Sequence, residues 1–217
     1  MTIPRASTEP VPEAANDARP MSRTRKSARK RDAIMVAATT ILNARTYALA
    51  TMTEIAAALD LRDATLYYYF PSKQALFYAC HVRTAERFER FIEMAEREGG
   101  TGLHKLDRFL FHLIDDSARS GPLLYFGDYF HLEDEQRAAV AARAEELTER
   151  LERFLQAGIE DGSVVPCETR LVVQLLLGML IWLAKWVPTV EGITAERLLA
   201  AMGAFSLHGL RSRDGPG

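Results

Sequence analysis

The chain has 217 residues, of which 48% are hydrophobic and 26% are charged. These proportions are those of an ordinary folded protein, and they exclude a wholly disordered chain, a collagen and a small disulfide-rich domain. The formal charge of −2 at pH 7 does not by itself point to a polyanionic partner, so any affinity for nucleic acid depends on how the charges are distributed. Cys80 and Cys167 lie far apart in apolar helical patterns, which favours free thiols and a cytoplasmic protein.

The N-terminus changes in character near residue 20. Residues 1–20 contain four prolines and no apolar run, so we expect no signal peptide, no membrane anchor and no ordered structure there. The next residues carry six positive charges with no acid between them: Arg23, Arg25, Lys26, Arg29, Lys30 and Arg31. Such a segment is a solvated tail when it stands alone, but it binds phosphates when it precedes a nucleic-acid-binding unit.

Three helices are predicted before residue 70. Apolar residues at helical spacing indicate the first, over residues 34–44. Thr51 to Glu54 has the form of a capping box and predicts a short second helix directly after Thr51. Asp60 stands where the chain must reverse, and aspartate tolerates the left-handed conformation. A third short helix is expected over residues 62–69.

The remaining chain is also predicted to be helical. Ser72 is a natural N-cap for a long fourth helix that ends before Gly99 and Gly100, and Thr194 begins the last helix with a hydrophobic staple. Helices are expected over residues 103–120, 133–162, 168–187 and 194–211, with one or two short turns in 123–130. The most apolar stretch, 171–187, is shorter than a bilayer requires and indicates a buried helix. No alternating strands are found, so we predict an all-α fold.

Residues 51–70 have the spacing of a helix-turn-helix, a motif whose second helix enters the major groove of DNA. Apolar side chains such as Ile55 and Leu66 hold the two helices together. Arg62, Asp63 and Thr65 are then left on the outward side of the second helix with two tyrosines. Hydrogen-bonding groups at this density can address phosphates and base edges.

The segment Ile55 to Lys73 resembles the DNA-binding domain of TetR-family repressors, whose sequences typically read I-A-x-x-A-G-V-S-x-G-T-L-Y-x-Y-F-x-S-K. The portion T-L-Y-x-Y-F-x-S-K is intact here as Thr65 to Lys73, and the similarity covers about residues 30–80. The family has glycine, alanine, glycine and serine at four positions where this chain has Thr46, Leu59, Asp60 and Arg62. The next two positions also depart, with Asp63 and then Ala64 before Thr65. The departures around the second helix bear on base preference rather than on the fold.

The resemblance implies that the second helix of the motif and its flanks contact DNA. The expected contacts are Thr53, Arg62, Asp63, Ala64, Thr65, Tyr67, Tyr68, Tyr69 and Lys73. Packing is the alternative role for the three tyrosines. Lys73 is expected to meet a phosphate, and the carboxylate of Asp63 suits the N4 amine of cytosine, with Arg62 beside it for guanine.

The resemblance further implies a homodimer through the last two helices. Residues 175–181 are apolar around the whole helix, which suits one face in the core and another against a second subunit. A monomer in which this helix is wholly buried is the alternative.

The central helices of such a chain would enclose an effector pocket. Small-molecule sites are mostly apolar with a few polar groups, so we expect an apolar or amphipathic effector. The expected lining residues are Phe111, His112, Phe126, Tyr129, Phe130, Trp182 and Trp186, for which ordinary core packing is the alternative. Residues 155–162 and the helix with the two tryptophans are similar to regulators of fatty-acid or sterol degradation, whose effectors are acyl-CoA thioesters.

Motifs of catalysis and metal binding are not found. The sequence has no serine elbow, no glycine-rich phosphate loop and no H-E-x-x-H motif, so we predict neither an enzyme nor a cofactor. Only His112 and Asp115 have a ligand-like spacing, which makes a metal sensor the weaker alternative.

The sequence predicts three parts. Residues 1–28 form a disordered tail with a basic arm, 29–75 form the helix-turn-helix domain, and 76–217 form the helical effector-binding and dimerisation domain. The predicted function is that of a transcriptional regulator, a repressor that an effector releases from a palindromic operator. Two alternatives stay open: a DNA-binding protein of the same fold that recruits a protein partner outside transcription, and a lipid-binding module without specific DNA affinity.

Overall fold

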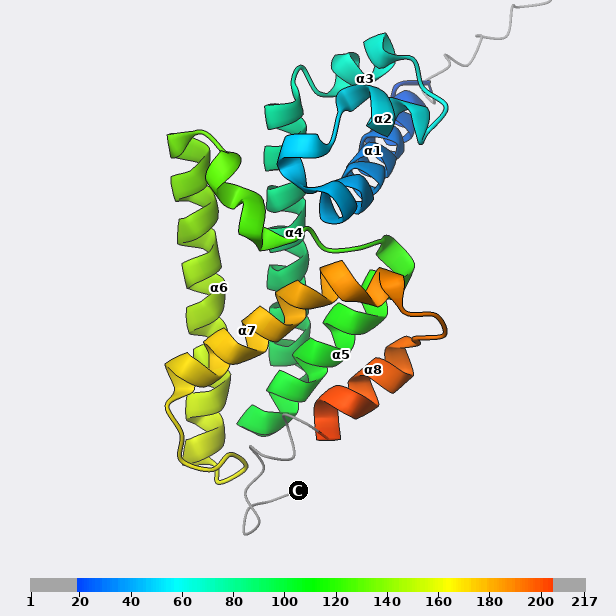
Figure 1. Ribbon diagram of the computed structural model, residues 1–217. Coiled ribbons are helices and arrows are strands. Elements are labelled where there is room, and N and C mark those ends of the chain that lie inside the picture. The colour runs from blue at the N-terminus through cyan, green and yellow to red at the C-terminus, as the bar shows by residue number, and fades with distance from the viewer. Residues whose placement is uncertain (1–18, 205–217) are drawn as a thin grey trace, which may run out of the picture.

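The structure is a computed structural model of the chain, and it describes residues 19–204. The predicted tail at 1–18 and the end of the last predicted helix, 205–211, lie outside these residues. The regular elements of the described part are all helices, joined by short loops, with no strand between residues 19 and 204. Figure 1 shows α1, α2 and α3 grouped at one end, and α4 running from this group into the bundle formed by the later helices.

The helices have the following bounds: α1 Arg19–Leu49, α2 Met52–Ala57, α3 Asp63–Tyr69, α4 Lys73–Glu98, α5 Gly102–Ser120, α6 Asp134–Glu160, α7 Thr169–Trp186 and α8 Ala195–Met202. Two 3-10 helices, η1 Phe126–His131 and η2 Val187–Thr189, join α5 to α6 and α7 to α8. The all-α prediction is confirmed, including the short turns in the aromatic stretch after Gly121.

The first helix is much longer than predicted. It begins at Arg19, so residues 19–28, which we expected to be disordered, are helical. The physical reason lies in the composition, because arginine, lysine, alanine and methionine are good helix formers. Pro20 stands in the first turn, where proline is tolerated. The basic segment is therefore a helical extension rather than a flexible arm.

The predicted helix starts after Thr51 and Ser72 are confirmed by their caps, whereas α1 ends at Leu49 rather than near residue 44. The Thr51 hydroxyl accepts a hydrogen bond from the Glu54 amide at 3.1 Å, and Ser72 accepts one from the Ala75 amide at 3.0 Å. Asp60 adopts the left-handed conformation with φ 52°. The Glu54 carboxylate does not close the capping box toward Thr51 but pairs with Arg45 at 3.0 Å.

Thr46 interrupts α1 near its C-terminal end. Its backbone has φ 69° and ψ 164°, a region that residues with a Cβ rarely adopt. The family pattern has glycine here, so the threonine holds a backbone turn that glycine adopts without strain.

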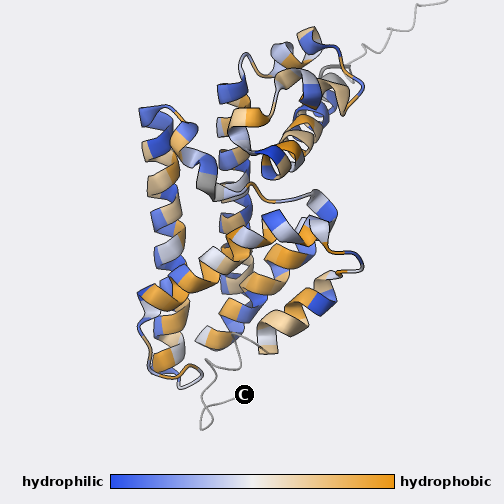
Figure 2. Ribbon diagram, in the orientation of Figure 1, coloured by the Kyte–Doolittle hydropathy of each residue, from blue (hydrophilic) through white to orange (hydrophobic). Residues whose placement is uncertain are grey.

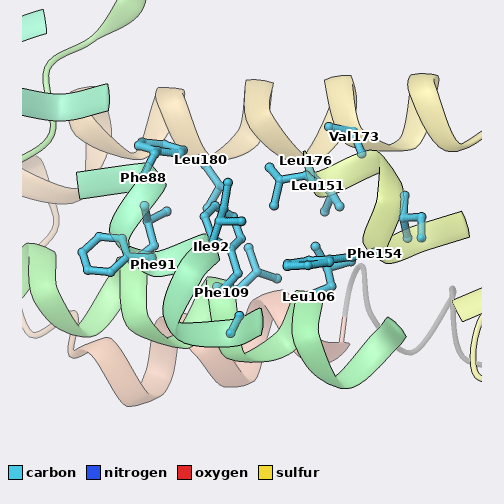
Figure 3. Close-up of a cluster of buried hydrophobic side chains, with 14 of the residues drawn as sticks. Phe88, Phe91, Ile92, Leu106, Phe109, Leu151, Phe154, Val173, Leu176 and Leu180 are labelled. Atoms are coloured by element: carbon cyan, nitrogen blue, oxygen red, sulfur yellow. The ribbon is translucent and has the colours of Figure 1, made fainter. Parts of the chain in front are cut away.

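The larger of two hydrophobic clusters fills the bundle. Figure 3 shows side chains of α4, α5, α6 and α7 meeting there, among them Phe88, Phe109, Phe154 and Leu176. These side chains are almost completely buried, and each contributes about 1.5–3 kcal/mol through its removal from water.

A smaller cluster joins the end formed by α1, α2 and α3 to the bundle. Ile34, Ile55 and Leu66 of the first three helices pack there with residues of the later part of the chain such as Leu124 and Val140. Helix α4 contributes to both clusters. The predicted boundary at residue 75 therefore falls at the start of a helix that belongs to both parts of the core.

Both cysteines are free. Burial raises the pKa of the Cys80 thiol to about 12, so this thiol stays protonated and unreactive. Among the described helices, the segment Thr169–Thr189 has the length and composition of a membrane span. This stretch is therefore longer than the sequence predicted, and its helix is only partly buried, with Leu171, Leu175 and Trp182 exposed.

Candidate nucleic-acid interface and effector cavity

Helix α3 presents one polar side to the outside. Leu66 is fully buried and fixes α3 against the first two helices, whereas the side chains of Tyr67 and Tyr68 are 48% and 82% exposed. Arg62, Asp63 and Ala64 are also exposed, and Thr65 and Tyr69 are half-buried. The predicted contact residues of α3 thus lie on the side of the helix that remains accessible to a ligand as large as DNA.

The basic segment of α1 lies beside α3. Lys26, Arg29 and Lys30 line one groove together with Thr65 and Tyr68. This arrangement places positive charge next to the outward face of α3, where it can neutralise phosphates.

Arg31 of the same segment has a structural contact. Its Nη1 donates to the Tyr69 carbonyl at 2.9 Å, and its guanidinium lies 4.1 Å from the centre of the Phe70 ring. Arg31 therefore ties the C-terminal end of α3 to α1.

Asp63 is held by a neighbour on α2. The Thr53 hydroxyl donates to Oδ2 of Asp63 at 2.7 Å, across the turn between the two helices. The carboxylate stands in the first turn of α3, where the helix dipole stabilises negative charge. Thr53 and Asp63, which the sequence predicted separately as DNA contacts, are thus hydrogen-bonded to each other.

Lys73 at the start of α4 is half-buried. Its Nζ donates to the Ala50 carbonyl at 2.8 Å and lies 4.3 Å from the centre of the Tyr47 ring. Burial lowers the pKa of the Lys73 ammonium. The side chain therefore fastens the start of α4 to the end of α1, and a phosphate contact would add to this role.

A cavity of about 370 Å³ lies between α4, α6, α7 and the segment before η1. Its walls are mainly apolar, with Thr84, Tyr129 and Thr148 as polar groups inside and Glu145 and Gln174 on exposed positions. The apolar part of the lining is Ala85, Phe88, Leu123, Leu124, Ala141, Ala144, Leu147, Leu177, Gly178, Leu180 and Ile181. The size and character are those of a small-molecule site.

Of the predicted effector residues, Tyr129 lines this cavity and several others lie elsewhere. Phe111 is on the outer face of α5 under the guanidinium of Arg108. Nε2 of the His112 ring lies 2.6 Å from Oε1 of Glu98. Phe130 is 57% exposed. The sequence marked these residues as aromatic or polar but did not show which side of each helix faces the bundle.

The two tryptophans of α7 also lie away from the cavity lining. Trp182 is 55% exposed, with its ring 6.2 Å from that of Tyr125, and Trp186 is half-buried at the end of the helix. The Phe126 side chain lies outside the described part of the structure. Thr84, Thr148 and Gln174 were missed because a single polar residue in an apolar stripe is a weak signal.

The segment after α5 links the cavity to α1. Asn43 is only 5% exposed; its Nδ2 donates to the Leu123 carbonyl at 2.8 Å, and its Oδ1 accepts from the Tyr125 amide at 2.8 Å. Lys185 of α7 donates to the Asn43 carbonyl at 2.7 Å. We call these three hydrogen bonds the Asn43 clamp.

Two further contacts reinforce this connection. The Leu124 amide donates to the Thr84 hydroxyl at 3.1 Å, inside the cavity. The Tyr47 amide donates to the Asp128 carboxylate of η1 at 2.9 Å. The same short segment therefore forms a cavity wall and holds the C-terminal end of α1.

One side of α7 lacks a covering partner in the described chain. Leu171, Leu175 and Trp182 are 53%, 75% and 55% exposed, and a Cβ added to Gly178, which also borders the cavity described above, would meet no atom within 4 Å. These four residues follow one another at spacings of four, three and four, which places them on a single stripe. Figure 2 shows apolar residues (orange) along much of α7, whose opposite side carries the buried Val173, Leu176 and Leu180. We call the exposed side the α7 stripe.

Two family profiles match the chain. The profile of the bacterial regulatory proteins, tetR family, matches residues 34–80. The profile of the tetracyclin repressor-like C-terminal domain matches residues 99–210, which is more than half of the chain. Comparison with curated protein sequences gives no match.

Solved structures show the same fold. The TetR family transcriptional regulator PfmR from Thermus thermophilus is 24% identical over 82% of this chain and 98% of that one, with a TM-score of 0.69. The regulator AibR in complex with isovaleryl coenzyme A and operator DNA is 24% identical over 82% and 98%, with a TM-score of 0.68. The ketosteroid regulator KstR2 of Mycobacterium tuberculosis is 16% identical over 85% and 96%, with a TM-score of 0.73.

Proposed function

We propose that this chain, which belongs to the TetR family of bacterial regulatory proteins, is a repressor that leaves its operator when an effector fills the cavity between α4, α6 and α7. Proteins of this family are DNA-binding transcriptional regulators rather than enzymes. The observation that carries the proposal is the Asn43 clamp, because it bonds a wall of the cavity to the helix that flanks α3. We assign the protein to the cytoplasm, where its DNA target lies.

DNA recognition is assigned to α3 and its surroundings. Asp63, Ala64, Thr65, Tyr67, Tyr68 and Tyr69 approach the bases and the sugar-phosphate backbone, while Thr53, Arg62 and Lys73 contact the backbone or the adjacent base. The groove formed with Lys26, Arg29 and Lys30 supports this assignment, since phosphate contacts supply most of the affinity and fix the orientation of the protein on the duplex.

A homodimer follows from the α7 stripe. Burying its leucine and tryptophan side chains against the same stripe of a second subunit, together with α8, forms a four-helix bundle. Two α3 helices related by a two-fold axis then match a palindromic operator with half-sites about one helical turn apart or a multiple of it. Dimerisation is typical of the family, and the exposure of the stripe supports it here.

The effector is an apolar or amphipathic molecule. Hydrocarbon walls with a few hydroxyl groups suit an acyl chain or a ring system. Two similar structures are those of an isovaleryl coenzyme A complex and of a ketosteroid regulator, which supports an acyl-CoA or another lipid-like compound. A filled cavity pushes on Leu123 and Leu124 and shifts α1 through the clamp, so the effector favours the conformation that does not fit the operator.

The test is a binding-site selection with the purified dimer on genomic fragments, followed by addition of acyl-CoA thioesters. We expect a few promoter-proximal palindromes and their release by one acyl class. Ala144→Leu fills the cavity from α6 without touching the DNA-binding end, so this variant should bind the same palindromes and no longer respond. Many dispersed sites, or release of the variant and the natural chain alike, would contradict the proposal.

Base preference has a test of its own in Asp63. Asp63→Ala removes the carboxylate that accepts from a cytosine N4 amine, so discrimination should fall by about 1–3 kcal/mol at one base pair in each half-site. Asp60→Asn is the matched control, because it removes an exposed carboxylate near DNA but not on α3. An unchanged consensus for Asp63→Ala, or uniform weakening on all sequences, would assign the carboxylate to helix stability alone.

A further inference from the structure

A second cavity, of about 380 Å³, lies beside the effector cavity and is lined by the C-terminal part of α7. It is enclosed by α5 and α8, with Thr40 of α1 at one side and the residues around η2 at another. Its volume falls within the range of sites that hold small molecules in proteins, roughly 300–1,000 Å³. The proposed repressor mechanism assigns no role to this space.

The lining of the second cavity contains no charged residue among those the structure describes. Its three hydroxyl groups already have partners within their own segments: Thr40 donates to the Val36 carbonyl at 3.1 Å and Ser117 to the Leu113 carbonyl at 2.8 Å. Thr194 accepts from the Arg197 amide at 3.2 Å. A ligand here therefore meets mainly hydrocarbon, and a charged or strongly polar group would lose its hydration without compensation.

The two cavities adjoin. Leu123 and Leu180 line both of them, and the remaining walls differ in character. The first cavity has the phenol of Tyr129, the amide of Gln174 and the carboxylate of Glu145, whereas the described lining of the second has no phenol, amide or charge. This gradient suits a molecule with a polar end in the first cavity and a hydrocarbon end in the second.

We infer that the second cavity is a subsite for the distal hydrocarbon part of the effector, so that a single elongated amphipathic molecule passes Leu123 and Leu180 and occupies both cavities. The inference rests on the proposed effector response and deepens it by defining the ligand class as one with an extended apolar portion. The ligand then reaches Thr40, one turn of α1 before Asn43. Its length therefore determines whether it touches α1 directly.

Saturated primary alcohols from 1-hexanol to 1-dodecanol test the inference, because they carry one polar end and no charge. Their dissociation constants are obtained from the thermal stabilisation of the full chain at increasing alcohol concentrations, in the absence of DNA. Each methylene buried in an apolar site strengthens binding about fourfold. In the natural chain this increase should continue through the longer alcohols.

Ala184→Leu places a larger side chain in the second cavity, from α7, and leaves the lining of the first unchanged. The short alcohols should bind this variant as they bind the natural chain, while the longest should bind at least about tenfold more weakly. Ala144→Leu, which fills the first cavity, should weaken all the alcohols. Ala195→Leu approaches the second cavity from α8 and repeats the test if Ala184→Leu does not fold.

Three results would overturn the inference. In the first, the affinity for the alcohols rises with chain length as steeply in Ala184→Leu as in the natural chain. In the second, Ala184→Leu loses affinity for short and long alcohols by the same factor. In the third, the natural chain binds none of the alcohols. None of these results concerns DNA, so they leave the repressor proposal standing. Conversely, if no specific operator is found, the repressor proposal is refuted, while the dependence of alcohol affinity on chain length can still be measured.

Discussion

The Asn43 clamp makes a quantitative prediction about both stability and effector response. Asn43→Ala removes the side chain that pairs with the Leu123 carbonyl and the Tyr125 amide at 2.8 Å each. Asn43 is buried, so both backbone groups lose a partner in a place with little access to water. Each such group costs about 1–3 kcal/mol, and the free energy of unfolding should fall by about 2–6 kcal/mol.

The functional part of the prediction concerns coupling rather than stability. In allosteric proteins, coupling free energies between two ligand sites typically correspond to a roughly 5–150-fold change in affinity. In Asn43→Ala, the operator affinity should be nearly the same with and without the effector. The variant without effector should still bind the operator. The assay is a fluorescence anisotropy titration of labelled operator with and without the effector found in the release experiment.

Leu42→Ala is the matched control for this experiment. Leu42 is buried on the same helix next to Asn43, and its truncation costs about 2–5 kcal/mol by leaving a cavity without breaking the clamp. This variant should lose stability and keep the effector response. A full response in Asn43→Ala, or an equal loss of response in Leu42→Ala, would refute the role assigned to the clamp.

Thr46, His81 and Lys73 each allow a test by a single substitution. Thr46→Gly should raise the free energy of unfolding by about 1 kcal/mol, because it relieves a backbone strain of about 1–3 kcal/mol and costs about 0.5–1 kcal/mol in the conformational freedom of glycine. Thr46→Ala keeps a Cβ and should not raise the free energy of unfolding. Equal denaturation midpoints for the two variants would contradict this. Burial lowers the pKa of His81 to about 4, although the charge of Asp128 acts in the opposite direction. The unfolded chain therefore binds more protons than the folded chain between about pH 4 and 6.5, and the free energy of unfolding should fall by about 1.4 kcal/mol for each pH unit of acidification in this interval. Urea titrations of His81→Leu at several pH values should lack this component, and an unchanged pH dependence in the variant would show that it has another origin. Lys73→Ala should weaken operator binding on all sequences and reduce the salt dependence by about 0.9 for each phosphate that the variant no longer binds; an unaltered salt slope would leave Lys73 with its contacts to Ala50 and Tyr47 alone.

Local sequence signals predicted the DNA-binding end well. Thr51, Asp60 and Ser72 each act through their own side chain or backbone within a few residues, so their effects were visible in the sequence and were confirmed. The outward face of α3 followed from the burial of Leu66. The extension of α1 to Arg19 was missed because a charged segment without apolar spacing resembles a tail, although its residues favour a helix.

The effector cavity was harder to predict because it depends on how distant helices pack. Phe111 and Tyr129 are equally aromatic in the sequence, but one faces outward and the other lines the cavity. Likewise, residues 175–181 are apolar all round, yet the structure turns Leu175 outward and Leu177 toward the cavity. The clamp joins Asn43 to residues some eighty positions later, and no local pattern reports such a contact.

The proposed dimer interface on the α7 stripe can be tested with a single substitution. Leu175→Lys places a charge on the most exposed leucine of the stripe, whereas Leu177 faces the cavity and is a poorer choice. The variant should sediment as a folded monomer and lose affinity for a palindrome. A folded dimer would place the interface on another surface.

The central claim is that effector binding in the cavity and operator binding by α3 oppose each other. It is tested most directly by two measurements on the natural protein: operator affinity at rising concentrations of the releasing effector, and effector affinity with and without operator. Because the coupling is reciprocal, both affinities should fall by the same factor, and Ala144→Leu should show no such change. Simultaneous binding of operator and effector with unchanged affinities would contradict the account.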